Sequence, residues 1–341
     1  MASDRPGWKA DIAPYAQADV PRSILDLLTS VVPYLALMVL QIALLQDGVS
    51  FWIVLPLAIP TAGFLLRTYI VFHDSTHGSF LPTKRGNHIL GAIVGLIVFT
   101  PFQTWRHSHA MHHATAGDLD RRGSGDVPTM TVDEYLAHDL PMRAGYRAFR
   151  NPMVMFGLGW LWGLVIQPRL TNKNMRTRLK RSTWVTNLVL AAVITGICLL
   201  VGPGTFFLAQ GPAAALAGSA GVFLFYVQHQ FEDTYWENTG AWSYSDAALR
   251  GSSYLKLPQP FQFFTGNIGL HHVHHLSARV PNYRLQAAVD NVALFDDVPV
   301  LTFWDGVKAS RLKVWDPASH RLLTWREVRA LRRAVPAVAT T

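Results

Sequence analysis

The sequence has little cysteine and little charge. Its single cysteine, Cys198, stands in an apolar stretch without a partner, which excludes an internal disulfide framework and a cysteine-based metal site. Only 15% of the residues are charged, whereas 50% are hydrophobic. This balance is typical of a membrane protein, and any metal chemistry must use other ligands.

The N-terminal segment lacks the apolar run of a cleavable secretory signal. Its first residues carry charges, Asp4 and Arg5 among them. We therefore expect residues 1–24 to form a cytoplasmic tail. The formal net charge of +8 fits either a nucleic acid or a membrane surface as partner, so the positions of the basic residues must decide.

Four apolar stretches approach the roughly 20 residues that a helix needs to cross the hydrocarbon core of a bilayer. We place these spans at 25–46, 51–71, 184–201 and 206–228. The sequence therefore predicts an all-α integral membrane fold, in which four transmembrane helices carry a cytoplasmic helical cap. In this interpretation residues 25–290 form the membrane domain and residues 291–341 a cytoplasmic C-terminal region.

The basic residues avoid two of the links between these spans. Residues 46–50 and 202–211 contain neither Lys nor Arg. The region between the two pairs of spans and the C-terminal region are rich in both: Arg143, Arg147, Arg150, Arg169, Lys173, Arg176, Arg178, Lys180, Arg181, Arg321, Arg326, Arg329, Arg332 and Arg333. By the positive-inside rule both termini are cytoplasmic, at the inner membrane in a bacterium, and no nucleic-acid partner is needed to explain the charge.

Two further apolar segments, 89–102 and 153–166, are too short to cross a bilayer comfortably. We interpret them as re-entrant or interfacial helices. A full crossing at 89–102 would put the histidines before and after it on opposite sides of the membrane, and a shared site would then be impossible.

Histidines are the strongest signal in the chain, because nine of the fourteen fall in four places. They are His73 and His77 in HDSTH; His109, His112 and His113 in HAMHH; His229; and His271, His274 and His275 in HHVHH. Residues three and four apart share a helix face, so each cluster can converge on one point. Each cluster also adjoins an apolar stretch, which places the imidazoles just outside the bilayer.

Nine imidazoles exceed the needs of one metal ion. Neutral imidazole suits iron, copper, nickel or zinc, and a zinc site is filled by four ligands. Two redox metals with four or five ligands each fit the number better. An ordinary polar role at helix ends remains the better interpretation for the isolated His88, His138 and His320.

A second set of polar residues lies beside these clusters and is expected to orient the ligands by hydrogen bonds. It comprises Asp74, His107, His272, Asp118, Asp120, Glu232 and Asp233. For the acids, a solvated surface position is an equal alternative.

The four histidine segments resemble a known family. HDSTHGSF at 73–80, SHAMHHATAGDLD at 108–120 and HHVHHLSARVPNY at 271–283 resemble the three histidine boxes of the membrane fatty acid desaturases, and YVQHQFEDTYW at 226–236 resembles a fourth segment. The likeness runs from about residue 20 to about 290 and is greatest to the acyl-lipid omega-6 (delta-12) branch.

The resemblance implies a non-haem di-iron centre with the nine clustered histidines as ligands, O2 as co-substrate and a fatty-acyl lipid as substrate. Some members carry a fused cytochrome b5 domain with a His-Pro-Gly-Gly segment, which this sequence lacks. We therefore expect a separate electron donor, a ferredoxin or a cytochrome b5.

Two alternatives stay open on the sequence. The same centre can act as a hydroxylase, acetylenase or ketolase. Outside enzymes, a histidine-rich membrane metal transporter is possible, but it predicts ligands along a path at mid-membrane, whereas these histidines adjoin the ends of apolar stretches and no inverted repeat is visible.

Overall fold

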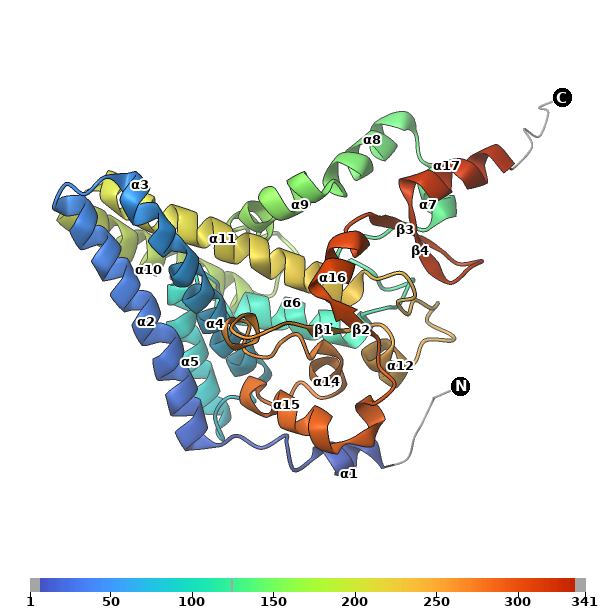
Figure 1. The fold of residues 1–341 in the computed structure, drawn as a ribbon, viewed down its shortest axis with the longest axis horizontal. Helices are drawn as coiled ribbons and strands as arrows, with labels where there is room; N and C mark the ends of the chain where they lie inside the picture. Colours follow the sequence, from blue (N-terminus) through green and yellow to red (C-terminus); the bar gives the residue numbers. More distant parts are fainter. Residues whose placement is uncertain (1–6, 124, 335–341) are drawn as a thin grey trace.

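The structure is a computed structural model that describes residues 7–123 and 125–334. Residues 1–6 of the expected N-terminal tail and residues 335–341 of the expected C-terminal region lie outside the described residues. Most of the described chain is helical (Figure 1). The α-helices are α1 (Trp8–Ile12), α2 (Val20–Gln46), α3 (Phe51–Val54), α4 (Ala58–His77), α5 (Lys84–Ile97), α6 (Phe102–Thr115), α7 (Val132–Ala137), α8 (Leu140–Phe149), α9 (Pro152–Gly157), α10 (Thr177–Val201), α11 (Pro203–His229), α12 (Tyr244–Leu249), α13 (Phe261–Phe264), α14 (His271–Leu276), α15 (Asn282–Asn291), α16 (Phe303–Ala309) and α17 (Trp325–Ala334).

Within the described residues, four helical segments are long and apolar enough to cross a membrane. They are α2, the run from Phe51 to His77 that includes α3 and α4, α10 and α11. Each contains one of the predicted spans and extends beyond it. The hydrophobic window marks only the apolar part of a helix, whereas backbone hydrogen bonds continue into polar sequence at its end. These polar extensions of α4 and α11 carry histidines.

Local sequence explains two of the helix ends. The side chain of Asp19 accepts a hydrogen bond from the backbone N–H of Arg22, so α2 begins at Val20, five residues before the predicted span. Gly78 has a φ of 72°, a left-handed conformation that glycine adopts without strain, and α4 ends there directly after His77.

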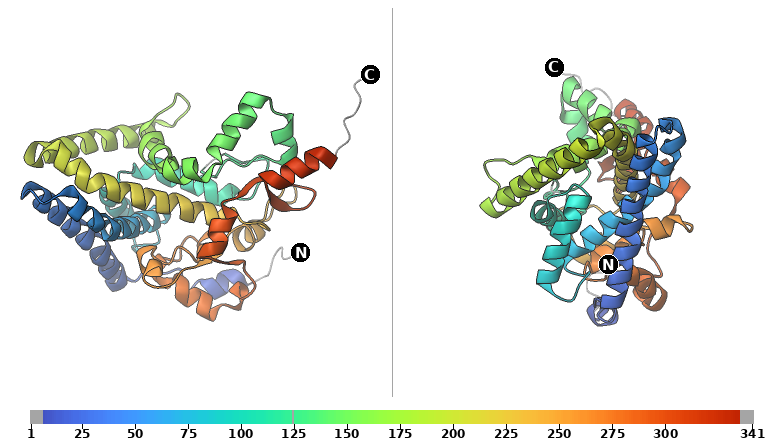
Figure 2. Two further views of the ribbon diagram at one scale, coloured as in Figure 1. Left: turned by 45° about the horizontal axis from the view of Figure 1, so that its top comes forward. Right: turned by 90° about the vertical axis from the view of Figure 1, so that its left-hand side faces the viewer.

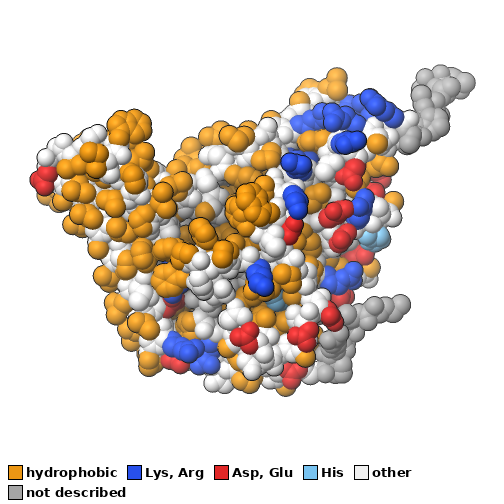
Figure 3. All heavy atoms as spheres, viewed as in Figure 1, with side chains coloured by type: hydrophobic (Ala, Val, Ile, Leu, Met, Phe, Trp, Pro, Cys, Tyr) orange, Lys and Arg blue, Asp and Glu red, His pale blue; other side chains and the backbone are white. Residues whose placement is uncertain are grey.

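Helix α4 is central to the apolar part of the molecule and packs against α2, α5 and α11. Its buried Phe72 lies in a core with Val94 of α5 and Phe102 of α6. In Figure 3 apolar side chains cover the part of the surface over α2 to α4, and charged side chains gather on the opposite half.

Helices α5 and α6 meet at a bend of 104°, across the short break between Ile97 and Phe102. The chain therefore turns back, and this brings His109 of α6 beside His77 of α4, with ring centroids 4.8 Å apart. The segment predicted at 153–166 divides into α9 and a π-helical turn, η2 (Leu161–Ile166). It continues into a 3-10 turn, η3 (Gln167–Arg169), and two further 3-10 turns are η1 (Leu55–Leu57) and η4 (Ala293–Phe295).

The prediction of an all-α fold is wrong in one respect, because two small sheets complete the cap. Strand β1 (Tyr254–Lys256) pairs in parallel with β2 (Val300–Thr302), and β3 (Leu312–Asp316) pairs antiparallel with β4 (Arg321–Thr324). The β3–β4 hairpin is stabilised by burial of Trp315 and Leu322 in one cluster with Trp236, shortly after the end of α11. Strands this short carry little periodicity, so the sequence pattern did not reveal them.

The two ends of the described chain lie on the cap (Figure 2). Ile12 of α1 is 1% exposed and packs in one cluster with Val273 of α14 and Leu285 of α15. The N-terminal region is therefore folded onto the segment that carries the third histidine cluster.

Candidate metal centre

The first group of imidazoles comes from three helices. Its members are His73 and His77 of α4, His109 of α6 and His274 of α14, and their possible ligand atoms all lie within 4.8 Å of one another. The Nε2 atoms of His73 and His109 are 3.0 Å apart. Helix spacing places both histidines of α4 on one face, as predicted.

The second group lies beside the first. His112 of α6, His229 of α11, and His271 and His275 of α14 bring their ligand atoms within 4.8 Å, and all four are buried. The Nε2 atom of His229 is 3.2 Å from that of His112 and 2.9 Å from that of His271. Four helices therefore converge on two adjacent groups.

His113 joins the first group and borders the second. Its Nε2 atom lies 3.1 Å from that of His109 and 3.0 Å from that of His274. Its ring stacks on that of His275 at a centroid distance of 4.1 Å. The nine clustered histidines thus divide into five and four, and His113 is the side chain between them.

Each HxxHH motif divides between the two groups, although the sequence suggested convergence on one point. On α6 the first and last histidines, His109 and His113, face the first group, whereas His112 faces the second. Neighbouring residues on a helix point about 100° apart, so adjacent histidines diverge. One short helix can therefore serve two ions.

Hydrogen bonds behind the rings fix the tautomer of two imidazoles. Nδ1 of His229 donates to the backbone carbonyl of Gly251 at 3.1 Å, and Nδ1 of His112 donates to the carboxylate of Asp126 at 2.5 Å. In the neutral form of each ring this tautomer leaves the lone pair on Nε2, and these two Nε2 atoms lie 3.2 Å apart. A cation between the lone pairs stabilises this arrangement, and an isolated pair of rings is repelled.

Further observations fit metal ions. Buried Nε2 atoms of His77 and His275 have no hydrogen-bond partner among the described residues. Two nitrogens at about 2.1 Å from one ion are about 3.0 Å apart at right angles and about 3.4 Å apart in a tetrahedron. The Nε2 separations of 2.9–3.2 Å are close to those of nitrogens that share one ion.

The three ligand candidates on α14 are neutral at ordinary pH. Burial lowers the pKa of His271, His274 and His275 well below the usual value of 6.5, and neighbouring imidazoles lower it further. Only neutral imidazole binds a metal ion, so the site is set for binding without proton release.

Among the residues expected to orient ligands, Asp74 is in place: its carboxylate lies 3.1 Å from Nδ1 of His73. Others make different contacts. Asp118 pairs with Arg121 and Glu232 with Arg321. Among the described residues, the remaining members of this set do not contact a clustered histidine through a hydrogen bond. His107 and Asp233 are exposed, and Asp120 accepts a hydrogen bond from the backbone of Thr239. His272 lies against the rings of Tyr254 and Phe295.

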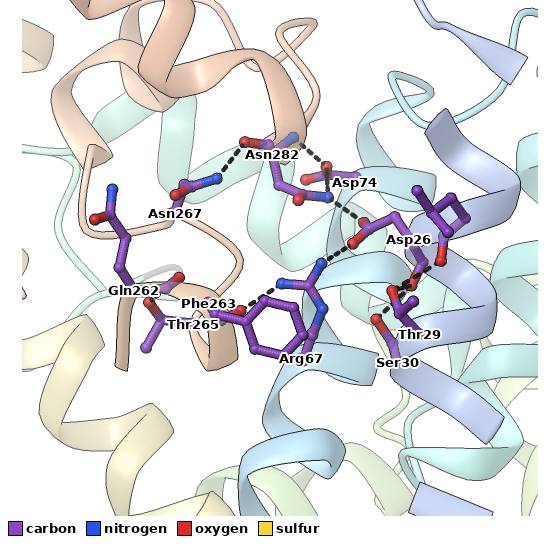
Figure 4. Close-up of polar contacts among 11 residues, drawn as sticks. Asp26, Thr29, Ser30, Arg67, Asp74, Gln262, Phe263, Thr265, Asn267 and Asn282 are labelled. Atoms are coloured by element: carbon purple, nitrogen blue, oxygen red, sulfur yellow. Dashed lines mark hydrogen bonds and ion pairs between the residues drawn. The ribbon is translucent and has the colours of Figure 1, made fainter. Parts of the chain in front are cut away.

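Asp74 is the end of a buried polar network (Figure 4). Its second oxygen accepts hydrogen bonds from the backbone and side-chain nitrogens of Asn282, at 2.7 and 3.0 Å. The same amide donates to Asp26 of α2 at 2.9 Å, and Asp26 pairs with Arg67 of α4. Arg67 also donates to the carbonyl of Phe263 and covers its ring at 4.0 Å. Helix α2 carries none of the nine clustered histidines, yet Asp26 and Asn282 connect it to Asp74 beside His73.

Sequence reasoning missed Asp126, Asn282, Asp26 and Arg67. A signal existed for two of them: Asp26 and Arg67 are ionisable residues inside or at the end of apolar helices, where charge is costly and functional. Asp126 had no such signal, because it lies in a Gly-rich loop whose course the sequence does not fix.

The similarity to known proteins covers the residues described above. The family model of fatty acid desaturases matches residues 50–305, three quarters of the chain, including all nine clustered histidines. The chain belongs to the fatty acid desaturase family. This assignment favours an enzyme over the metal transporter.

Several desaturases are similar to the chain over most of its length. A Bacillus subtilis (strain 168) protein named fatty acid desaturase is 41% identical over 325 residues, covering 95% of this chain and 92% of the relative. The sn-1 oleoyl-lipid 12-desaturase of Synechocystis sp. is 27% identical over 241 residues, covering 70% and 68%. A chloroplastic omega-6 fatty acid desaturase of Spinacia oleracea is 26% identical over 245 residues, covering 70% and 53%.

Proposed function

We propose that this desaturase is embedded in a membrane and uses O2 and two iron ions to introduce a double bond into a fatty-acyl chain. The observation that carries the proposal is the convergence of nine imidazoles into adjoining groups of five and four. His73, His77, His109, His113 and His274 would hold one ion, and His112, His229, His271 and His275 the other.

The chemistry requires a redox metal. The substrate loses two hydrogens from neighbouring methylenes, and with O2, two electrons and two protons the products are the alkene and two waters. An unactivated methylene has no acidic proton, so side-chain acid–base catalysis cannot break its C–H bond, and bound iron would supply the oxidant. The side chains of the protein would orient the acyl chain and exclude water from the metal centre.

An apolar wall supports acyl binding beside the first group. The ring of Trp105 stacks on that of His109 at 4.3 Å and packs edge-on against Phe72 and Tyr69. These side chains shield one side of the imidazoles with apolar surface. Phe72 is buried behind the other two rings, and we propose that Trp105 and Tyr69 hold the reacting methylenes in register, because position along a featureless chain is read only by distance from an anchor.

The proposed topology has four crossings with both termini and the metal centre in the cytoplasm. The four long helices, the bend between α5 and α6 and the distribution of Lys and Arg support it. Residues 25–290 would form the membrane desaturase domain, and residues 291–341 would complete its cytoplasmic cap.

We further propose an acyl-lipid substrate and a delta-12 or omega-6 position for the double bond. The names of the Synechocystis and Spinacia relatives support this choice. We also propose a separate ferredoxin or cytochrome b5 as the electron donor.

The proposal is tested by iron content and lipid analysis. The protein is expressed in a host with a suitable reductase, its metal content is measured after purification, and the host lipids are separated by chromatography. We expect two irons per chain and a new unsaturated acyl chain. A single zinc, or unchanged lipids although the protein is reduced, would contradict the proposal; a hydroxylated product would identify the alternative reaction.

A further inference from the structure

A long stretch of the chain carries basic residues without any acid. Between Leu140 and Arg181 the sequence has no Asp or Glu. Its basic residues are Arg143, Arg147, Arg150, Arg169, Lys173, Arg176, Arg178, Lys180 and Arg181. We name residues 140–170 the strap; it comprises α8, α9, η2 and η3. Arg150 is buried and donates to acceptors within the protein, but the excess of one sign among the other cations favours anionic partners from outside the segment.

Helix α8 has the form of a helix that lies on a surface. Its Tyr146 is buried and donates a hydrogen bond to the backbone carbonyl of Lys313 at 2.7 Å, which fixes the inner side of the helix. Arg143 and Arg147 follow one flank of the helix, and Met142 and Phe149 follow the other, exposed to 49% and 38%. Basic and apolar flanks on one helix are typical of helices at a membrane interface.

The middle of the strap exposes large apolar side chains. Met153 is 81% exposed, Leu158 61% and Trp162 58%. They continue the apolar surface of α10 and α11, against which α9 and the following turns pack. In Figure 1 the line of α9 and α8 runs obliquely to α2 and α11 and does not extend the bundle. An exposed apolar strip in this position marks contact with another apolar phase.

Helix α17 adds a second basic face beside α8. Its Trp325 and Val328 point inward, and Arg147 of α8 lies over the Trp325 ring at 4.9 Å. The outer face carries Arg326, Arg329 and Arg333, all exposed. Of the acids nearby, Glu327 accepts from Thr324, and Asp139 caps α8. Basic side chains from the two helices gather at one end of the molecule in Figure 3.

We propose that the strap and α17 form a docking surface for anionic phospholipid headgroups. The proposal rests on the membrane embedding proposed above and adds the lipid class that the cap recognises. The arginines would pair with headgroup phosphates, while Met153 and Trp162 enter the outer acyl region. An acidic protein partner would match the charge alone and leave the apolar strip in water, so a lipid surface fits both observations.

The test compares the whole protein in two nanodiscs, one of phosphatidylcholine and one of phosphatidylcholine mixed with phosphatidylglycerol. Hydrogen exchange is followed by mass spectrometry. We expect slower exchange at 140–149 and 325–334 in the anionic disc, and high salt should remove the difference. In Arg329→Gln/Arg333→Gln the gain in protection should fall by about 25-fold, since each basic residue near an anionic surface contributes about fivefold.

The matched control is Arg279→Gln/Arg311→Gln, which removes two exposed cations outside the strap and α17. It should keep the full effect of phosphatidylglycerol. Equal exchange in the two discs, an equal effect of the control, or protection only by an acidic electron-donor protein would overturn the inference. Acyl desaturation measured in the same discs separates the two proposals, because activity without lipid-dependent protection removes the inference alone.

Discussion

Asp126 shows how a proposed ligand depends on the group behind it. Its carboxylate accepts from Nδ1 of His112 and thereby directs the Nε2 lone pair of that ring toward the second group. Asp126→Asn keeps the shape and removes the charge, and we expect iron affinity to fall by about 10- to 100-fold. Competition with a chelator measures the iron affinity. Asp118→Asn, which alters a carboxylate paired with Arg121 away from the imidazoles, should leave the affinity unchanged; equal losses would refute the assignment.

Removal of a proposed ligand should have a larger effect. His112 is 1% exposed and lies 3.2 Å from His229, so His112→Ala leaves the second group with three imidazoles. We expect loss of activity and less than two irons per chain. His138 is exposed and isolated, and His138→Ala should change neither quantity. Iron analysis and product assays on both variants decide, and a parallel loss in both would contradict the ligand set.

At this scale the sequence revealed the clustered histidines more readily than the residues that contact them. Histidine spacing is a local property, so the nine clustered side chains stand out in the sequence itself. The partner of His112 is 14 positions away across a loop, and only the fold brings Asp126 to it. Glu232 adjoins His229 in sequence but points to Arg321, because proximity along the chain does not fix direction at the end of a helix.

Helices α2 and α4 are joined by a buried ion pair whose loss should be costly. Asp26 and Arg67 are 6% and 12% exposed. Arg67→Met leaves the carboxylates of Asp26 and Asp74 buried without a cation, and we expect a loss of about 3–5 kcal/mol in the free energy of unfolding. The double variant Asp26→Asn/Arg67→Met should recover most of the lost free energy of unfolding. Denaturation in detergent measures both, and a double variant less stable than Arg67→Met alone would contradict this account.

The β3–β4 hairpin should make stability depend on pH. Burial, with a further contribution from Arg150, lowers the pKa of Lys313 from 10.5 to about 8, and its ammonium donates to the backbone carbonyl of Arg150. Between pH 8 and 10.5 the unfolded chain binds a proton that the folded chain does not, so the free energy of unfolding should rise with pH. Unfolding midpoints across this range measure it.

The control for this prediction lies nearby. Lys313→Met should flatten the rise, whereas Lys308→Met, at a side chain 73% exposed, should retain it. A rise of equal size in Lys313→Met would assign the pH dependence to another group.

Helices were predictable from the sequence where their apolar runs were long. Four apolar runs identified the four long helices, yet their bounds differ by up to seven residues, because polar turns such as residues 72–77 of α4 and 177–183 of α10 continue the helical hydrogen bonding. The bend between α5 and α6 fits the expectation that 89–102 does not cross. The strands were not predictable, since β1 and β2 have three residues each and pair across more than forty positions.

For the whole molecule, the single cysteine makes the proposed topology directly testable. In a Cys198→Ser background, Asp47→Cys places a thiol in the link between α2 and α3, and Ser319→Cys places one in the exposed turn of the β3–β4 hairpin. If the chain crosses the membrane four times with a cytoplasmic cap, the first thiol faces outward and the second inward. A membrane-impermeant maleimide should then label the first in intact cells and the second only in inside-out vesicles. Labelling of both thiols from one side would overturn the proposed topology. It would leave the geometry of the imidazoles unaffected, because contacts within the chain define the two groups of histidines. The orientation of the protein in the membrane is inferred separately, from the distribution of charge.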